Sequence, residues 1–228
     1  MENAGMDHYT AELAAWLRSH ADPAKAAPMA AYMRNKFPFL GLKTPERTRL
    51  IKAFWAKHGV PAGDELLDVV KRLWELPERE FQNAALAFLD KRGKRAGKED
   101  IDVVEHLIVT KPWWDTVDYL ASNATGDLLA KYPELIPAYA DRWIASDDLW
   151  LRRTALLYQL RYKERTDVGR LFAYIERCKD EREFFIRKAI GWALREYSKT
   201  DEDAVRRFVE RTPLSPLSAK EALKHVSR

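Results

Sequence analysis

The sequence predicts an all-α protein built from repeated pairs of helices. Three observations lead to this fold class. Helix start and stop signals recur along the whole chain, no convincing series of alternating strand-like runs occurs, and similar segments return at a spacing near 35 residues. The connections are short and no Ser/Gly-rich stretch divides the chain, so we expect one domain over residues 1–228.

Prolines and glycines mark where these helices begin and end. Thr44 and Pro45 are typical of an N-cap followed by the first helical position, and Gly59 is typical of the end of that helix. In the same way, Pro112 marks the start of a later helix and Gly93 marks the end of one. The predicted helices cover residues 8–20, 28–37, 45–58, 64–75, 78–92, 99–109, 112–123, 133–145, 148–163, 166–177, 183–198, 202–211 and 218–226.

The composition sets limits on the class of protein. Of the 228 residues, 46% are hydrophobic and 32% are charged, as in folded soluble proteins. The single cysteine, Cys178, excludes an intramolecular disulfide and a zinc cluster of cysteines. No apolar run approaches the roughly 20 residues of a membrane span, and the N-terminus lacks the features of a signal peptide. We therefore expect a cytoplasmic protein with no membrane partner, and its net charge of +4 is compatible with a polyanion.

The repeat aligns a set of polar residues. Three helical segments superpose on a small residue, which puts Asn83, Arg153 and Lys188 in one column, and Asp118 fills the missing position 35 residues before Arg153. A period near this value, carried by helix pairs, indicates a curved α-solenoid of HEAT-like repeats, in which one column lies along the concave face. The alternative is an irregular helical bundle with chance similarity.

Aromatic residues accompany this column. Residues four apart share a helix face, so Trp114 lies beside Asp118 and Trp192 lies beside Lys188. Trp192 points away from the apolar stripe of its helix, which favours a binding surface or a second buried face. Arg153 has apolar neighbours and requires an anion, either Asp118 or a ligand phosphate. By residue type alone, Asp118 is typical of a solvated charge on a helix.

These residues lie in segments that resemble a known family. The stretch LIVTKPWWDTVD over 107–118 is similar to the signature of the AlkD family of bacterial DNA alkylation-repair glycosylases. The resemblance spans almost the whole chain. It includes MAAYMR at 29–34, GLKTPER at 41–47, LWELPEREF at 73–81, WIASD at 143–147 and FFIRKAIGWALREY at 184–197.

The resemblance implies a function and assigns roles. The family is built from HEAT-like repeats and excises positively charged N3- and N7-alkylated purines, such as 3-methyladenine and 7-methylguanine, from duplex DNA without flipping the base. Its essential carboxylate matches Asp118, its sugar-flanking tryptophans match Trp114 and Trp192, and its groove arginine matches Arg153. Tyr32 matches an aromatic residue at the N-terminal end of the groove.

Binding is expected to be mainly to DNA phosphates in a concave groove, by a monomer that needs no cofactor. The chain contains no phosphate-binding glycine motif and no zinc-protease motif, and its five histidines lack ligand spacing, so we expect no metal. The further residues expected to bind DNA are Lys43, Thr44, Arg47, Arg152, Arg187, Lys188 and Arg195.

Two other classes of function are compatible with a helical repeat. A non-catalytic protein that binds distorted or branched DNA would not need Trp114, Asp118 and Trp192. A protein-interaction solenoid would favour an apolar or acidic groove, whereas the column found here is basic and aromatic.

Overall fold

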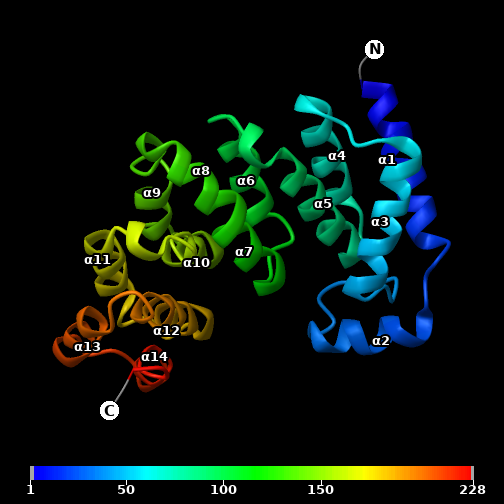
Figure 1. The fold of residues 1–228 in the computed structure, drawn as a ribbon. Coiled ribbons are helices and arrows are strands. Elements are labelled where there is room, and N and C mark those ends of the chain that lie inside the picture. The colour runs from blue at the N-terminus through cyan, green and yellow to red at the C-terminus, as the bar shows by residue number, and fades with distance from the viewer. Residues whose placement is uncertain (1–2, 227–228) are drawn as a thin grey trace. The chain divides into compact units, whose positions relative to one another are not determined.

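The computed structural model describes residues 3–226, and the regular structure within them is helical throughout (Figure 1). This confirms the all-α fold class. The α-helices are α1 (Asn3–Arg18), α2 (Pro23–Tyr32), α3 (Thr44–His58), α4 (Gly63–Glu75), α5 (Arg79–Arg92), α6 (Asp100–Val109), α7 (Trp114–Leu120), α8 (Gly126–Lys131), α9 (Ala140–Ile144), α10 (Leu149–Leu157), α11 (Val168–Cys178), α12 (Phe184–Ser198), α13 (Glu202–Arg211) and α14 (Pro216–Ala222).

The chain forms two compact units, which divide between Ala96 and Gly97. The first unit holds α1 to α5 and the second holds α6 to α14. That residues 1–228 form a single domain stays a prediction.

Over residues 3–226, no helix combines the length and the apolar character that a bilayer span requires.

In the first unit, α4 and α5 form an antiparallel pair against which α1 and α3 pack. The start of α5 is polar and completely buried. The Glu80 carboxylate accepts hydrogen bonds from the backbone N–H groups of Leu40, Gly41 and Leu42, at 2.9, 2.9 and 3.1 Å. Gln82 donates to carbonyl groups at the end of α4, among them that of Trp74 at 3.1 Å. The contacts of Glu80 fix the loop that leads into α3, and those of Gln82 hold the end of α4.

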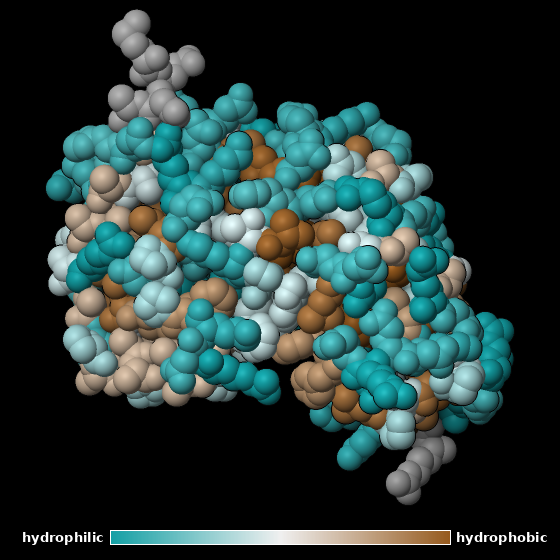
Figure 2. Space-filling model, turned by 180° about the vertical axis from the view of Figure 1, so that it is seen from behind, coloured by the Kyte–Doolittle hydropathy of each residue, from teal (hydrophilic) through white to brown (hydrophobic). Residues whose placement is uncertain are grey.

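Helix α2 begins and ends earlier than the prediction of 28–37. Its N-cap is Asp22, whose carboxylate accepts from the Ala24 N–H, and Pro23 follows at the first helical turn. Arg34 and Asn35, predicted to be helical, have φ of 55° and 54°, which the right-handed helix does not allow. No residue of α2 is buried, and pale brown side chains gather at the lower left of Figure 2, where this alanine-rich helix lies.

In the second unit, side-chain contacts join segments about one repeat apart. Arg153 contacts Asp118 at a separation of 35 residues, and Arg142 contacts Glu105 at 37. Similar contacts join Tyr162 to Gly126 at 36, Tyr174 to Asp141 at 33, and Thr212 to Glu176 at 36. The recurrence of this separation along the unit is what stacked helix pairs of about 35 residues produce.

The helical run that contains Asp118 differs from the prediction of 112–123. Helix α7 starts at Trp114, passes through a π-helical turn at Ala121–Thr125 and continues as α8. A Cβ at Gly126 would lie 2.7 Å from the Tyr158 carbonyl oxygen, so glycine permits the close approach of the chain after α10.

The predicted helices 133–145 and 148–163 are also shorter in the structure. The predicted helix 133–145 is a 3₁₀ turn at Pro133–Leu135 followed by α9, because Pro137 interrupts the segment and cannot donate a backbone hydrogen bond. The predicted helix 148–163 ends at Leu157 and continues as turns to Lys163, whose φ is 51°.

Candidate functional site

The centre of the candidate site is an ion pair between Asp118 on α7 and Arg153 on α10. Arg153 Nε lies 2.7 Å from Asp118 Oδ1, and Nη2 lies 2.9 Å from Oδ2. The Arg153 side chain is 6% exposed and that of Asp118 is 17% exposed. The third nitrogen, Nη1, donates to the carbonyl oxygen of Phe185 on α12. Of the two anions considered for Arg153, the structure thus supplies the internal one, Asp118.

An aromatic cluster that includes Phe185 lies beside the buried guanidinium. The rings of Trp113, Trp150 and Phe185 contact one another with centroid separations of 5.0 to 5.6 Å. Arg153 Cζ lies 5.7 Å from the centroid of Phe185. These rings come from the residue before α7 and from the first turns of α10 and α12, so the packing of three segments fixes the position of the arginine. Trp113, Trp150 and Phe185 are not among the site residues predicted from the sequence.

The surroundings of Asp118 shift its pKa in opposite directions. Burial raises the pKa of the carboxyl above the ordinary 3.8, the hydrogen bonds and charge of Arg153 oppose the rise, and the charge of Asp115 adds to it. Both Asp118 oxygens accept from Arg153, an arrangement that favours the ionised carboxylate. Asp118 is therefore a partly buried anion with a raised pKa and one fixed partner.

The two tryptophans lie on the elements that form this pair. Trp114 is the first residue of α7, one helical turn before Asp118, and is partly buried. Trp192 is a partly buried residue of α12, the helix whose Phe185 carbonyl holds Arg153. Helix α10 contacts both α7 and α12 (Figure 1). That these indoles contact a sugar stays a prediction.

The predicted phosphate-binding residues of the second unit have internal partners. Arg152 Nη2 donates to Glu181 Oε2 at 3.2 Å, and Arg187 Nε donates to the Glu181 carbonyl oxygen at 2.8 Å. Lys188 Nζ lies 3.3 Å from Glu221 Oε2, and Arg195 Nη1 pairs with the other oxygen of the same carboxylate.

The sequence analysis did not identify Glu181 or Glu221. Glu221 follows Lys188 by 33 residues, close to the repeat. A search for carboxylates about one repeat from each basic member of the column would therefore have found it.

The remaining predicted residues lie in the first unit. Tyr32 ends α2 with 73% of its surface exposed. Lys43 precedes α3, Thr44 is its first residue, and Arg47 Nη2 lies 3.4 Å from the Thr44 hydroxyl. Thr44 is not the N-cap that the sequence predicts, because Lys43 takes that position and no side chain caps the helix. Lys43, Thr44 and Arg47 follow the loop whose backbone N–H groups donate to the Glu80 carboxylate.

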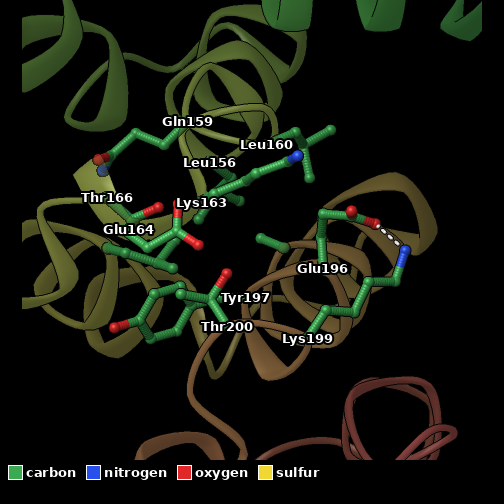
Figure 3. Close-up of a pocket in the computed structure, with 12 residues that line it drawn as sticks. Leu156, Gln159, Leu160, Lys163, Glu164, Thr166, Glu196, Tyr197, Lys199 and Thr200 are labelled. Carbon is green, nitrogen blue, oxygen red and sulfur yellow. Dashed lines mark hydrogen bonds and ion pairs between the residues drawn. The ribbon is translucent and has the colours of Figure 1, made fainter.

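A separate cavity of about 350 Å³ opens between α10, α11 and α12 (Figure 3). Gln159, Lys163, Thr166, Tyr197 and Thr200 are among its lining residues, and an ion pair between Glu196 and Lys199 lies at its edge. None of the site residues predicted from the sequence lines this cavity, so the ion pair of Asp118 and Arg153 lies outside it.

A family model described as "DNA alkylation repair enzyme" matches residues 13–226. A solved structure described as a predicted DNA alkylation repair enzyme from Enterococcus faecalis superposes with a TM-score of 0.85 at 32% identity, over 91% of this chain and 97% of that one. Among curated proteins, no match was found.

Two more distant structures share the fold. AlkD2 from Streptococcus mutans has a TM-score of 0.61 at 19% identity, over 82% of this chain and 91% of that one. The protein smu.31 from Streptococcus mutans UA159 has a TM-score of 0.59 at 21% identity, over 79% and 98% of the two chains. These two structures bear on the all-helical repeat fold alone, whereas the family model and the Enterococcus relative show that this chain belongs to the DNA alkylation repair enzyme family.

Proposed function

We propose that the protein is a monofunctional DNA glycosylase that hydrolyses the N-glycosidic bond of N3- or N7-alkylated purines in duplex DNA. The observation that carries this proposal is the Asp118 carboxylate, which Arg153 holds in a fixed orientation one helical turn from Trp114. Such an arrangement suits a reaction in which positive charge develops beside a preorganised anion.

The chemistry of the substrate explains why one carboxylate suffices. Alkylation at N3 or N7 gives the purine a positive charge, so the base leaves as a neutral molecule and needs no general acid. As the C1′–N bond breaks, positive charge gathers on the deoxyribose, as in an oxocarbenium-like glycosidase transition state. Asp118 stabilises that charge and positions a water molecule for attack on C1′.

The two indoles supplement the carboxylate in this proposal. Packed against the sugar, the faces of Trp114 and Trp192 each add cation–π stabilisation of about 0.5–2 kcal/mol. Because the leaving group is already activated by its charge, the enzyme does not need to enclose the base in a pocket, and the lesion stays stacked in the duplex. Damage without such a charge is not a substrate on this mechanism.

Arg153 positions the carboxylate in this proposal. Its three nitrogens bond to Asp118 and to the Phe185 carbonyl oxygen, so it holds α7 and α12 at a fixed place relative to the reacting sugar. The residues that bind the DNA backbone are then Tyr32, Lys43, Thr44 and Arg47 of the first unit and Arg152, Arg187, Lys188 and Arg195 of the second.

Replacing Asp118 by asparagine tests the function. Asp118→Asn retains the shape of the side chain and removes its charge, so excision of 7-methylguanine from a duplex should fall at least ~10²-fold, as for a lost electrostatic contact to a transition state. Binding to the same duplex should persist or tighten. Single-turnover release of free base, corrected for spontaneous depurination, gives the rate.

Two controls accompany this variant. Asp115→Asn removes a carboxylate from the first turn of the same helix and should cost at most a few tenths of a kcal/mol and much less activity. Because Asp118→Asn removes the charge that faces the buried Arg153, rates are compared at a temperature at which circular dichroism shows both variants folded. Excision by Asp118→Asn at the parental rate would instead favour a non-catalytic protein that binds distorted or branched DNA.

A further inference from the structure

Glu221 of α14 bridges two of the basic residues on α12. Its Oε2 lies 3.3 Å from Lys188 Nζ, and its Oε1 pairs with Arg195 Nη1. The Glu221 side chain is 15% exposed, whereas those of Arg195 and Lys188 are 22% and 37% exposed. The two cations therefore remain accessible while the carboxylate between them is largely covered.

The position of Glu221 is fixed by the packing of α14 on α12. A Cβ at Gly191 would lie 2.6 Å from the Glu221 Cβ and 3.0 Å from the Ser218 carbonyl oxygen, so the two helices touch at this glycine. The Ser218 hydroxyl donates to the Arg187 carbonyl oxygen at 2.9 Å. The packing of α14 against α12 therefore fixes the position of the Glu221 carboxylate.

The two cations that Glu221 bridges flank Trp192 along α12. On α12, Lys188 precedes the indole by four residues and Arg195 follows it by three, so the cations lie about one turn to either side. Together the two cations and Glu221 carry a net charge of one, not two. A DNA backbone that approaches Trp192 therefore meets a cluster whose charge matches a single phosphate.

We infer that Glu221 is a specificity-determining residue that competes with DNA phosphates for Lys188 and Arg195. The inference rests on the proposed function, in which α12 contacts the DNA backbone. By neutralising one of two charges, Glu221 limits the sequence-independent affinity of α12 for undamaged DNA. Such affinity retains a DNA-binding protein at non-specific sites. Discrimination between damaged and undamaged DNA then depends more on the contacts that Trp114, Asp118 and Trp192 make with the lesion.

The test measures binding to an undamaged duplex at several salt concentrations. Glu221→Gln keeps the size of the side chain and frees one positive charge for a phosphate. Its affinity at 0.1 M salt should rise roughly 5–10-fold, and the plot of log K against log salt should steepen by about one unit, as one added phosphate contact predicts. A purely structural role for Glu221 would lower the melting temperature without steepening the plot.

Two variants separate the local effect from the change in total charge. Glu176→Gln removes a carboxylate from α11 that pairs with Lys179, changes the net charge equally and should leave the slope as it is in the parent. In Glu221→Gln/Arg195→Gln, the freed charge is removed again, so the gain in affinity should disappear.

A second measurement does not depend on the folding of a Glu221 variant. Lys188→Gln/Arg195→Gln should flatten the slope by about one unit, because competition with Glu221 leaves these two cations only one phosphate contact in the parent, whereas two independent cations would lose about two. A loss of two units, or a Glu221→Gln variant that binds no more tightly than the parent, would overturn the inference. A parent protein that binds DNA but releases no alkylated base would contradict the proposed function and leave this inference standing.

Discussion

Asp118 must be ionised if it is to stabilise positive charge on a sugar. Burial raises its pKa, and the bidentate pair with Arg153 opposes that rise. DNA phosphates bound nearby would raise the pKa further, because like charges disfavour ionisation. The carboxylate therefore gives up its charge at a less acidic pH than an ordinary aspartate does.

The proposed mechanism predicts an acid limb in the pH dependence of excision. The ionised form is active, so the rate should be constant above the pKa of Asp118 and should fall as the pH drops through it, with a midpoint above 3.8. Single-turnover excision of 7-methylguanine between neutral and acid pH, corrected for spontaneous depurination, measures this midpoint.

The fold itself should survive this titration at Asp118. A carboxyl whose pKa is raised by folding binds its proton more readily in the folded state, so its contribution to stability is present at low pH and declines as the pH rises. Circular dichroism over the same range checks this point. The residual activity of Asp118→Asn should lack the acid limb, and an unchanged limb in that variant would assign the titration to another group.

Helix α12 makes contacts on more than one of its faces. Ile186 and Ile190 are buried in the core of the second unit, and Gly191 touches α14. The sequence pattern alone left open whether the face of Trp192 is a binding surface or a second buried face. The structure shows that part of this face, at Lys188 and Arg195, pairs with α14 and that the indole stays partly exposed.

The close contact at Gly191 predicts that alanine will not fit there. Gly191→Ala would place its Cβ 2.6 Å from that of Glu221, so α14 has to move, at a cost of about 1–3 kcal/mol in the free energy of unfolding. Chemical denaturation measures this cost. Because Glu221 moves with α14, DNA binding should also respond as in Glu221→Gln.

A second glycine provides a matched control for that substitution. A Cβ at Gly169 of α11 would lie 3.6 Å from an Asp167 oxygen, an ordinary contact. Gly169→Ala should therefore stabilise the protein by up to ~1 kcal/mol, as alanine does in an exposed helix. Equal effects of the two substitutions would mean that helix propensity, and not the contact with α14, governs Gly191.

At the scale of the whole molecule, the repeat is the feature that the sequence predicts best. The spacing of 35 residues between Asp118 and Arg153 is visible in the chain and becomes a direct ion pair in the structure. Spacing alone did not show whether Arg153 contacts that aspartate or a ligand, since both satisfy a buried guanidinium equally.

The sequence-based prediction failed at a local signal and at tertiary contacts. Asp22 caps α2 and Pro23 begins it, five residues before the predicted start at residue 28, although both signals are local. Glu221 contacts Lys188 and Arg195 across a helix interface, and no local pattern marks such a partner. The roles of Trp114, Trp192 and the first-unit residues stay predictions, since contact with DNA decides them.

The buried Glu80 carboxylate has a consequence for amide hydrogen exchange. Leu40, Gly41 and Leu42 belong to no helix, yet their N–H groups are bonded to a carboxylate that is fully covered. Their amide protons should therefore exchange with deuterium as slowly as those of buried helices, because exchange requires this part of the unit to open.

Replacing that carboxylate should show which oxygen protects which amide. In Glu80→Gln, we expect the side-chain oxygen to keep accepting from Gly41 and Leu42, so that the NH₂ group faces the N–H of Leu40. Only the Leu40 amide then loses its hydrogen bond to a charged group. Its proton should exchange faster by roughly tenfold or more. Residue-resolved exchange by NMR measures this, and rapid exchange of all three amides in the parent would contradict it. The loop at residues 40–42 is therefore ordered before a ligand binds, so the binding of a ligand to it would cost little conformational entropy.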